Sequence, residues 1–152
     1  RSAVSCPACI CRVPSPKDDV IRGAAALYMS VTGLVYITLL TGVDLGLLEP
    51  WINILMHIVM PLAVIADWLY QPAASKVASQ QALLWLIFPA VYLAYTLIRG
   101  AATNWYPYPF LNPANDGGYA SVAIYCIGIL AAFFILGWLI MSLGNVLKRN
   151  VR

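Results

Sequence analysis

The chain has 152 residues, of which 62% are hydrophobic and only 10% are charged, and its mean hydropathy is +0.80. Soluble globular domains are about 45–50% apolar and about 25% charged, so this composition excludes that class and indicates an integral membrane protein. The formal net charge of +3 needs no nucleic-acid partner, and none is predicted.

Residues 1–20 are predicted to form a cytoplasmic segment, or the loop that follows an earlier membrane helix, because the chain begins with Arg and has no signal-peptide pattern. This segment contains the sequence CPACIC, with Cys6, Cys9 and Cys11. A closed zinc site needs four ligands, and no histidine lies nearby, so an ordinary loop is favoured over metal binding or S-acylation. No metal and no other cofactor is therefore predicted.

Four stretches lack Asp, Glu, Lys and Arg, namely residues 23–43, 50–66, 77–98 and 117–147. A bilayer core about 30 Å thick requires roughly 20 apolar residues in a helix, and stretches of this length without alternation do not suit barrel strands. The predicted fold is therefore all-α, a polytopic transmembrane helix bundle. Residues 21–143 form its four spanning helices, near 21–41, 51–70, 81–99 and 119–143. Asp18 or Asp19 is expected to cap the first of these.

All but one of the 9 Lys and Arg residues fall on one side of this layout, and Arg99 is the exception. By the positive-inside rule, both termini are predicted to be cytoplasmic in a multi-pass protein of the cell membrane, with residues 144–152 as a basic cytoplasmic tail. Membrane lipids are the predicted partners. No pattern in the sequence sets an oligomeric state.

The single histidine of the chain, His57, lies in the second predicted helix on a face shared with Asn53. By helical rise it is about 9 Å below the outer interface marked by Trp51. Polar side chains in lipid tend to point into the bundle, so this face is predicted to contact other helices. Asp67 lies about 15 Å deeper and is not expected to orient the ring. A structural histidine and a general base both fit this position.

The outer end of the third predicted helix carries Tyr92, Thr96 and Arg99 on one stripe. By depth, we expect the polar atoms of this stripe to meet those of Asn53 and His57 in the outer leaflet. The group would then form a polar site between the second and third helices.

The loop after the third predicted helix has the sequence NWYPYPFLNP at residues 104–113. Trp105 and Tyr108 are among its aromatic residues, which favour the headgroup zone of a bilayer, so the loop fits an aromatic belt. Its three closely spaced prolines favour stiff, extended backbone, which fits an ordered lid over a site. The sequence leaves both interpretations open.

Several of these residues form a pattern that resembles a known family. The pattern is W-x-N-x-x-M-H from Trp51 to His57, followed by Pro61 and by YPF at residues 108–110. It is similar to the androgen-induced and androgen-dependent TFPI-regulating membrane protein family. The longer segment HIVMPLAVIADWLYQP looks closer still to the bacterial branch, the Pr6Pr family membrane proteins.

This resemblance implies a bundle with further helices upstream. For the animal members it implies hydrolysis of fatty acid esters of hydroxy fatty acids by a threonine nucleophile and a histidine. His57 looks like the counterpart of that histidine, whereas the threonine is expected upstream of Arg1.

Two functional hypotheses follow. The first is an intramembrane hydrolase that uses His57 as general base on a lipid-ester substrate. Its substrate-binding or oxyanion residues would come from the polar and aromatic candidates Asn53, Tyr92, Thr96, Arg99, Trp105 and Tyr108. The alternative is a non-enzymatic membrane protein, either a small transporter with Asp67 and His57 on its path or a lipid-binding module.

Overall fold

The computed structural model describes residues 16–43, 49–71, 73, 75–115 and 117–150, so the cysteines at positions 6, 9 and 11 lie outside the described residues. Within the described part of the chain the regular structure is entirely helical. Four helical stretches are long and apolar enough to cross a bilayer, and they are Lys17–Leu40, Pro50–Tyr70, Ser79–Thr103 and Gly118–Leu147. The predicted all-α fold with four membrane-spanning helices is confirmed.

The first helix begins five residues before the predicted position. Helix α1 is Pro16–Val35, and it continues into a π-helical turn, η1, at Tyr36–Leu40. A proline fits the first turn because that turn does not need its N–H, and acidic residues there face the positive end of the helix dipole. Asp19 does not act as the predicted cap, because it lies inside the first turn and its Oδ2 accepts hydrogen bonds from Ser75.

Prolines interrupt the second and third stretches. The second consists of α2 (Pro50–Ile54), the π-helical turn η2 (Leu55–Val59) and α3 (Met60–Tyr70). The third consists of α4 (Ser79–Leu84) and α5 (Ile87–Thr103). Pro61 has no N–H to donate to the carbonyl of residue 57, and Pro89 has none for the carbonyl of residue 85, so regular α-helical bonding fails at both places.

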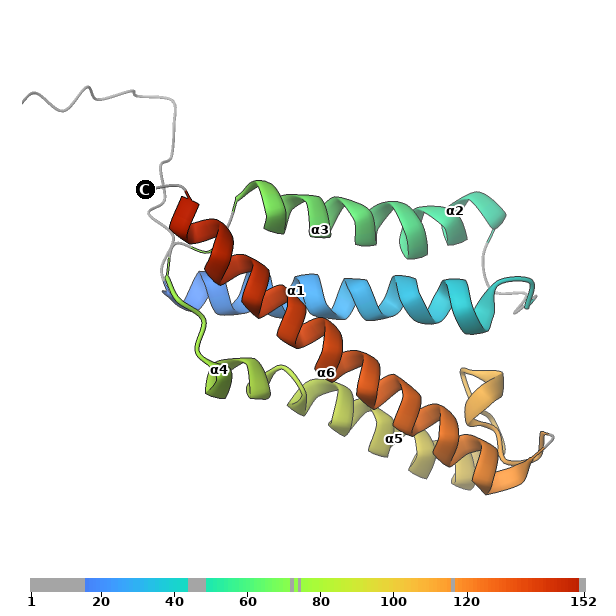
Figure 1. The fold of residues 1–152 in the computed structure, drawn as a ribbon. Helices are drawn as coiled ribbons and strands as arrows, with labels where there is room; N and C mark the ends of the chain where they lie inside the picture. Colours follow the sequence, from blue (N-terminus) through green and yellow to red (C-terminus); the bar gives the residue numbers. More distant parts are fainter. Residues whose placement is uncertain (1–15, 44–48, 72, 74, 116, 151–152) are drawn as a thin grey trace, which may run out of the picture.

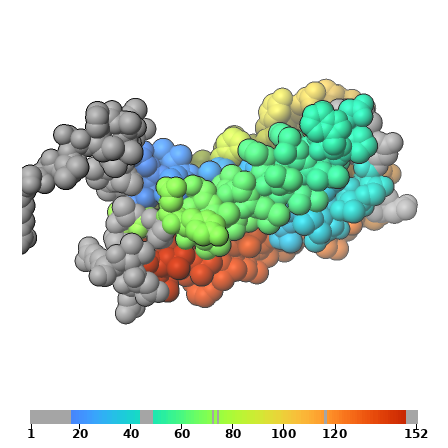
Figure 2. Space-filling model, turned by 90° about the horizontal axis from the view of Figure 1, so that it is seen from above, coloured from blue at the N-terminus to red at the C-terminus, as the bar shows by residue number. Residues whose placement is uncertain are grey.

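The fourth stretch is one long helix, α6, at Gly118–Asn150, and it extends beyond the predicted range of 119–143 into the basic tail. Figure 1 shows the four stretches running alternately in opposite directions, with α1 between the α2–α3 segment and α5. Helix α1 packs against both α3 and α6, and the space-filling view shows α2 and α3 lying over it (Figure 2). The expected direct meeting of the second and third spanning helices is therefore wrong, because α1 separates them.

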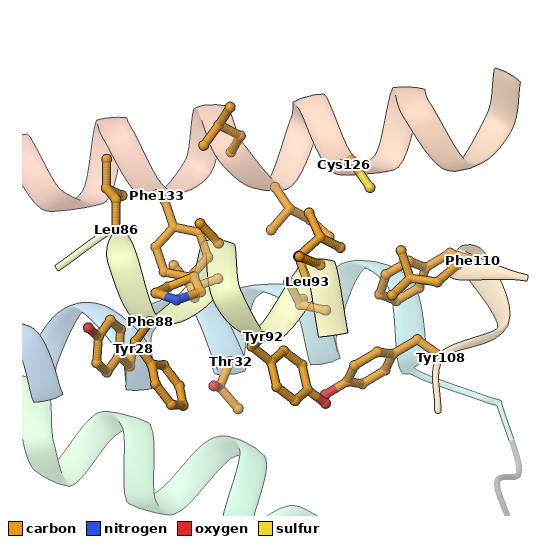
Figure 3. Close-up of a pocket in the computed structure, with 18 of the residues that line it drawn as sticks. Tyr28, Thr32, Leu86, Phe88, Tyr92, Leu93, Tyr108, Phe110, Cys126 and Phe133 are labelled. Carbon is orange, nitrogen blue, oxygen red and sulfur yellow. The ribbon is translucent and has the colours of Figure 1, made fainter. Parts of the chain in front are cut away.

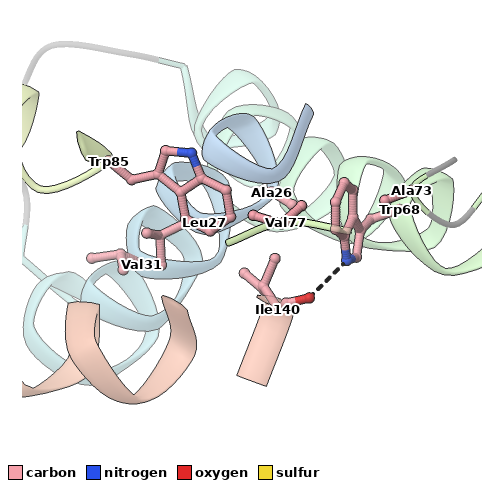
Figure 4. Packing of buried hydrophobic residues seen from close by; sticks show 8 residues of the cluster. All are labelled: Ala26, Leu27, Val31, Trp68, Ala73, Val77, Trp85 and Ile140. Atoms are coloured by element: carbon pink, nitrogen blue, oxygen red, sulfur yellow. Dashed lines mark hydrogen bonds between the residues drawn. The ribbon is translucent and has the colours of Figure 1, made fainter. Parts of the chain in front are cut away.

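The best-packed part of the protein lies where α1, α3 and α6 meet the segment before α4. Its buried residues are Ala26, Leu27, Val31, Trp68, Ala73, Val77, Trp85 and Ile140 (Figure 4). We call this part the core end and the opposite part, near residues 104–115, the loop end. Small residues allow close packing here, since a side chain at Gly23 would come within 2.6 Å of Trp85, and one at Gly144 within 2.6 Å of Trp68.

Polar side chains join the helices at the core end. Arg22 Nη2 donates to Asp67 Oδ2 at 2.9 Å and to the Gln71 carbonyl at 2.8 Å, which links α1 to α3. Asn145 on α6 accepts a hydrogen bond from the Val77 N–H at 3.1 Å and donates one to the Val77 carbonyl at 3.3 Å. Since hydrophobic force does not drive association between helices in lipid, such bonds and close packing hold this end together.

Candidate functional site

A cavity of about 740 Å³ lies between α1, α5, α6 and the loop at the loop end. This volume falls in the usual range for small-molecule sites, about 300–1,000 Å³. Along α1 it runs from Tyr28 to Leu40, or about 18 Å by helical rise, which is close to the depth of one leaflet of the bilayer core. Most of its wall is apolar, with side chains such as Leu86, Leu93, Cys126, Ile129, Leu130 and Phe133 (Figure 3).

The cavity ends abruptly toward the core end. The Tyr28 hydroxyl donates to the Trp85 carbonyl at 2.9 Å. This carbonyl has no helical partner, because the residue four positions later is Pro89, which lacks a backbone N–H. The Tyr28 ring lies beside the Phe88 ring, with centroids 5.6 Å apart. Beyond this pair, Trp85 is 2% exposed and packs against Gly23, which leaves no continuation of the cavity. Tyr28 and Phe88 therefore form its floor.

The loop after α5 covers the other end of the cavity. Tyr108, Phe110 and Leu111 line it, and Leu111 is buried in the short 3₁₀ helix η3 (Pro109–Leu111). The Tyr108 and Phe110 rings stack with centroids 5.3 Å apart, and Asn115 Nδ2 donates to the Pro109 carbonyl at 2.7 Å. Of the two interpretations of this loop, the geometry favours the ordered lid.

The position of this loop depends on a close contact at Gly100. A side chain there would come within 2.1 Å of the Tyr106 ring, whereas one at Gly128 on α6 would meet nothing within 4 Å. We expect Gly100→Val to expel the Tyr106 ring and raise the hydrogen exchange of residues 105–111 at least about tenfold, because closely packed interiors do not absorb an added side chain. Gly128→Val is the matched control and should leave this exchange unchanged. Equal exchange in the two variants would show that the loop does not rest on this contact.

His57 lines the cavity from the π-helical turn η2 and is held on two sides. Its ring stacks on the Tyr36 ring, with centroids 4.7 Å apart and planes 19° apart, and Tyr36 begins the other π-helical turn. His57 Nδ1 lies 3.0 Å from the Asn53 carbonyl. A carbonyl can only accept, so Nδ1 must carry the hydrogen, and in the neutral ring Nε2 then keeps a free lone pair.

Gly33 makes room for this arrangement. A side chain at Gly33 would come within 3.3 Å of both the His57 carbonyl oxygen and Pro61. Pro61 removes the normal helical partner of that carbonyl, and π-helical turns of this kind are frequent at functional sites. Gly33, Tyr36 and Pro61 together fix the height and the orientation of His57.

One wall of the cavity carries hydroxyl groups. Thr32, Tyr92 and Tyr108 lie along this wall in Figure 3, and the hydroxyls of Tyr92 and Tyr108 point toward one another. Burial, together with the hydrogen bond and the charge interaction with Tyr92, raises the pKa of Tyr108 to about 12. The Tyr108 phenol therefore stays protonated at any physiological pH and remains a hydrogen-bond donor.

A family model for FAR-17a/AIG1-like proteins matches residues 22–148, which include the four spanning helices almost entirely. The chain belongs to the FAR-17a/AIG1-like family. Among curated proteins and among solved structures, none matches the chain at a significant level. The family resemblance expected from the residues around His57 is thus confirmed, and assignment to the bacterial branch stays a prediction.

In this FAR-17a/AIG1-like chain, only some of the predicted site residues line the cavity. His57, Tyr92 and Tyr108 line it. Asn53 reaches His57 through its backbone carbonyl. Thr96 is 3% exposed and donates to the Tyr92 carbonyl at 2.8 Å, so its hydroxyl serves its own helix.

The remaining predicted residues lie away from the cavity wall. The Arg99 guanidinium lies over the Trp105 ring, 4.8 Å from its centroid, which is a cation–π arrangement at the loop end. Asp67, the residue considered for a transport path, forms the ion pair with Arg22 at the core end. As expected, it does not orient His57.

Sequence reasoning missed two residues of this family member that the structure adds to the site. Tyr36 supports the His57 ring, and Thr32 presents a hydroxyl that forms no hydrogen bond to the described part of the chain. Their spacing with Tyr28, four residues apart, indicates a common helix face, but only the position of α1 between the other helices shows what that face contacts. Among the described residues, no group of three or more His, Cys, Asp and Glu side chains could hold a metal ion.

Proposed function

We propose that the cavity binds a lipid acyl chain and that the protein hydrolyses lipid esters within the bilayer. The observation that carries this proposal is His57, whose Nδ1 is committed to the Asn53 carbonyl while the ring lines an apolar cavity. A histidine fixed in this tautomer can accept a proton at Nε2, which is what a general base requires. Of the two functions considered from the sequence, this geometry favours the hydrolase.

The shape and lining of the cavity support a lipid ligand. A polar metabolite would bury its polar groups against leucine and phenylalanine without partners, which is costly, whereas an acyl chain needs none. No Asp, Glu, Lys or Arg lines the cavity, so the part of the ligand inside it is uncharged. By family resemblance, the ligand class is that of fatty acid esters of hydroxy fatty acids.

The reaction that fits this site is acyl transfer to a hydroxyl. His57 Nε2 takes the proton of the attacking hydroxyl, which by the family resemblance belongs to a threonine upstream of Arg1, and the oxygen bonds to the ester carbonyl carbon. Thr32 and the hydroxyl of the Tyr92–Tyr108 pair that does not donate to the other are the available donors for the negative charge that forms on the carbonyl oxygen. The ester C–O bond then breaks, the leaving alcohol takes the proton from His57, and water hydrolyses the acyl-enzyme in the same way.

Arg99 has a secondary place in this proposal. Its guanidinium lies outside the cavity lining, stacked on Trp105 close to the covering loop. A free carboxylate on the part of the lipid that projects from the cavity would find a cation there. The same side chain would not contact the ester itself.

The proposal is tested by filling the cavity. Ala94 lines the cavity. Ala101 lies seven residues further along α5 and does not line it. We expect Ala94→Trp, in the full-length protein reconstituted in phospholipid vesicles, to lower hydrolysis of a branched fatty acid ester by at least about 100-fold, because a blocked cavity cannot place the ester beside His57. Ala101→Trp is the matched control and should retain wild-type turnover.

Two other outcomes would contradict the hydrolase, and a third would contradict the role of the cavity. Ester binding that Ala94→Trp abolishes, without turnover in the wild type, would identify a lipid-binding module. Flux across the vesicle that depends on a pH gradient and is lost in Asp67→Asn would identify a transporter, although Asp67 lies in the ion pair with Arg22 rather than in the cavity. Equal turnover in both tryptophan variants would remove the cavity from the reaction.

A further inference from the structure

The cavity has a dead-end compartment on the core-end side of His57. The level of His57 along α1 is given by Tyr36, on which its ring stacks. Tyr28 lies eight residues before Tyr36, so the floor is about 12 Å below the histidine by helical rise. The Phe88 ring, which comes from α5, lies beside the Tyr28 ring, with centroids 5.6 Å apart (Figure 3). An acyl chain that extends from His57 toward the core end therefore meets the floor after about 12 Å.

Tyr28 is the part of this floor that the protein holds in place. Tyr28 is tied to the Trp85 carbonyl at 2.9 Å, and Trp85 is fully packed against α1. Phe88 also lines the cavity, beside Tyr28, but it is 65% exposed and its ring is less enclosed by the protein than Trp85 is. The Tyr28 ring thus sets the depth of the compartment, and the Phe88 ring reduces the space above it.

We propose that Tyr28 and Phe88 are specificity-determining residues, which limit the length of the acyl chain whose ester carbonyl can lie beside His57. This inference rests on the proposed hydrolase function and adds that the site selects substrates by the length of the acyl chain. An acyl chain short enough to fit between the carbonyl and the floor leaves the ester at the histidine. A longer chain meets the Tyr28 and Phe88 rings first and holds its ester too far toward the loop end.

The bilayer determines how this selection depends on length. In water, each buried methylene adds binding energy, but a chain that leaves lipid for an apolar cavity exchanges one apolar surrounding for another. Methylenes that fit therefore gain little, while methylenes that do not fit force overpacking against the floor. Hydrolysis is expected to be nearly independent of acyl length up to a limit and then to fall steeply, rather than to rise steadily with length.

The test is a series of saturated acyl esters that share one alcohol and differ only in acyl length, assayed with the full-length protein in vesicles. We expect Phe88→Ala to move the limit to longer chains, so that the ratio of turnover just above the wild-type limit to turnover just below it rises roughly tenfold. Phe88→Trp should move the limit to shorter chains. Phe134→Ala is the matched control, since Phe134 is an exposed phenylalanine on α6, as Phe88 is on α5, but lies outside the cavity lining, and it should keep the wild-type limit.

A second measurement needs no turnover. Saturated fatty acids of the same lengths would displace a fluorescent fatty acid bound in the cavity, and the longest effective competitor should shift in the same directions in the two Phe88 variants. Hydrolysis or displacement with one unchanged limit in wild type, Phe88→Ala and Phe88→Trp would overturn this inference and leave the hydrolase intact. Displacement with shifted limits but without hydrolysis by the wild type would overturn the proposed reaction and support the length limit.

Discussion

Replacing His57 by alanine or glutamine should lower hydrolysis of lipid esters by about 10²- to 10⁴-fold while leaving the fold intact, which is the usual contribution of a general base. Glutamine is the more informative variant, because it keeps a polar side chain of similar reach but cannot take up a proton. The fold should survive because His57 is only half-buried and lies outside the packed core. Turnover of a branched fatty acid ester in vesicles, with helix content followed by circular dichroism, measures both effects.

The matched control for this prediction is Tyr36→Phe. Tyr36 contributes the ring that stacks on His57, and phenylalanine keeps that ring while removing the hydroxyl. Turnover within about threefold of wild type is expected for Tyr36→Phe, since stacking needs only the ring face. Wild-type turnover in His57→Gln would show that the histidine is structural, as the simplest interpretation of its sequence position allowed.

The largest loss of stability is expected for Trp68→Ala. Trp68 is 2% exposed, its Nε1 donates to the Ile140 carbonyl at 3.2 Å, and its ring fills the space that Gly144 leaves open. Alanine would leave a cavity between α3 and α6 and would remove the hydrogen bond to the Ile140 carbonyl, which keeps only its partner within α6. We expect the free energy of unfolding to fall by roughly 3 kcal/mol, because in lipid the loss is mainly one of packing and of this hydrogen bond.

Trp138 on α6 provides a control of the same residue type. It is 62% exposed and lies outside the core cluster, so Trp138→Ala should change the free energy of unfolding by less than about 0.5 kcal/mol. Unfolding by titration with sodium dodecyl sulfate in mixed micelles compares the two variants directly. Similar losses for both would mean that the core end does not govern stability.

The number and the approximate bounds of the spanning helices could be predicted because they depend on composition alone. Long charge-free stretches leave few alternatives in a bilayer, and each of the four appears in the structure. The bounds failed where local chemistry decides them. Pro16 starts the first helix early, and Pro89 divides the third stretch at a carbonyl that Tyr28 then binds.

The site was harder to predict because the residue pattern of one helix does not show which other helices are its neighbours. Helical spacing predicted a face with Asn53 and His57 and another with Tyr92 and Thr96, but the sequence does not show that α1 lies between the two helices. The structure brings His57 and Tyr92 to one cavity that α1 also lines, while the Thr96 hydroxyl bonds within its own helix. Tyr36 and Thr32 could have been found only by knowing that α1 is central.

The hydrogen bonds and buried rings of the core end share no residue with the hydroxyl wall, with His57 or with the covering loop. The two regions are connected through residues of α1 and α6, namely Tyr28, Val31, Val35, Ile129 and Phe133. Substitutions in α5 and in the loop therefore alter ligand fit at little cost to assembly. In a bundle divided in this way, substitutions on the cavity side can change which lipids are accepted, while selection preserves the packing of the core end. Sequence variation among relatives is then expected to concentrate on cavity positions of α5, and Tyr28 should vary least among the cavity residues.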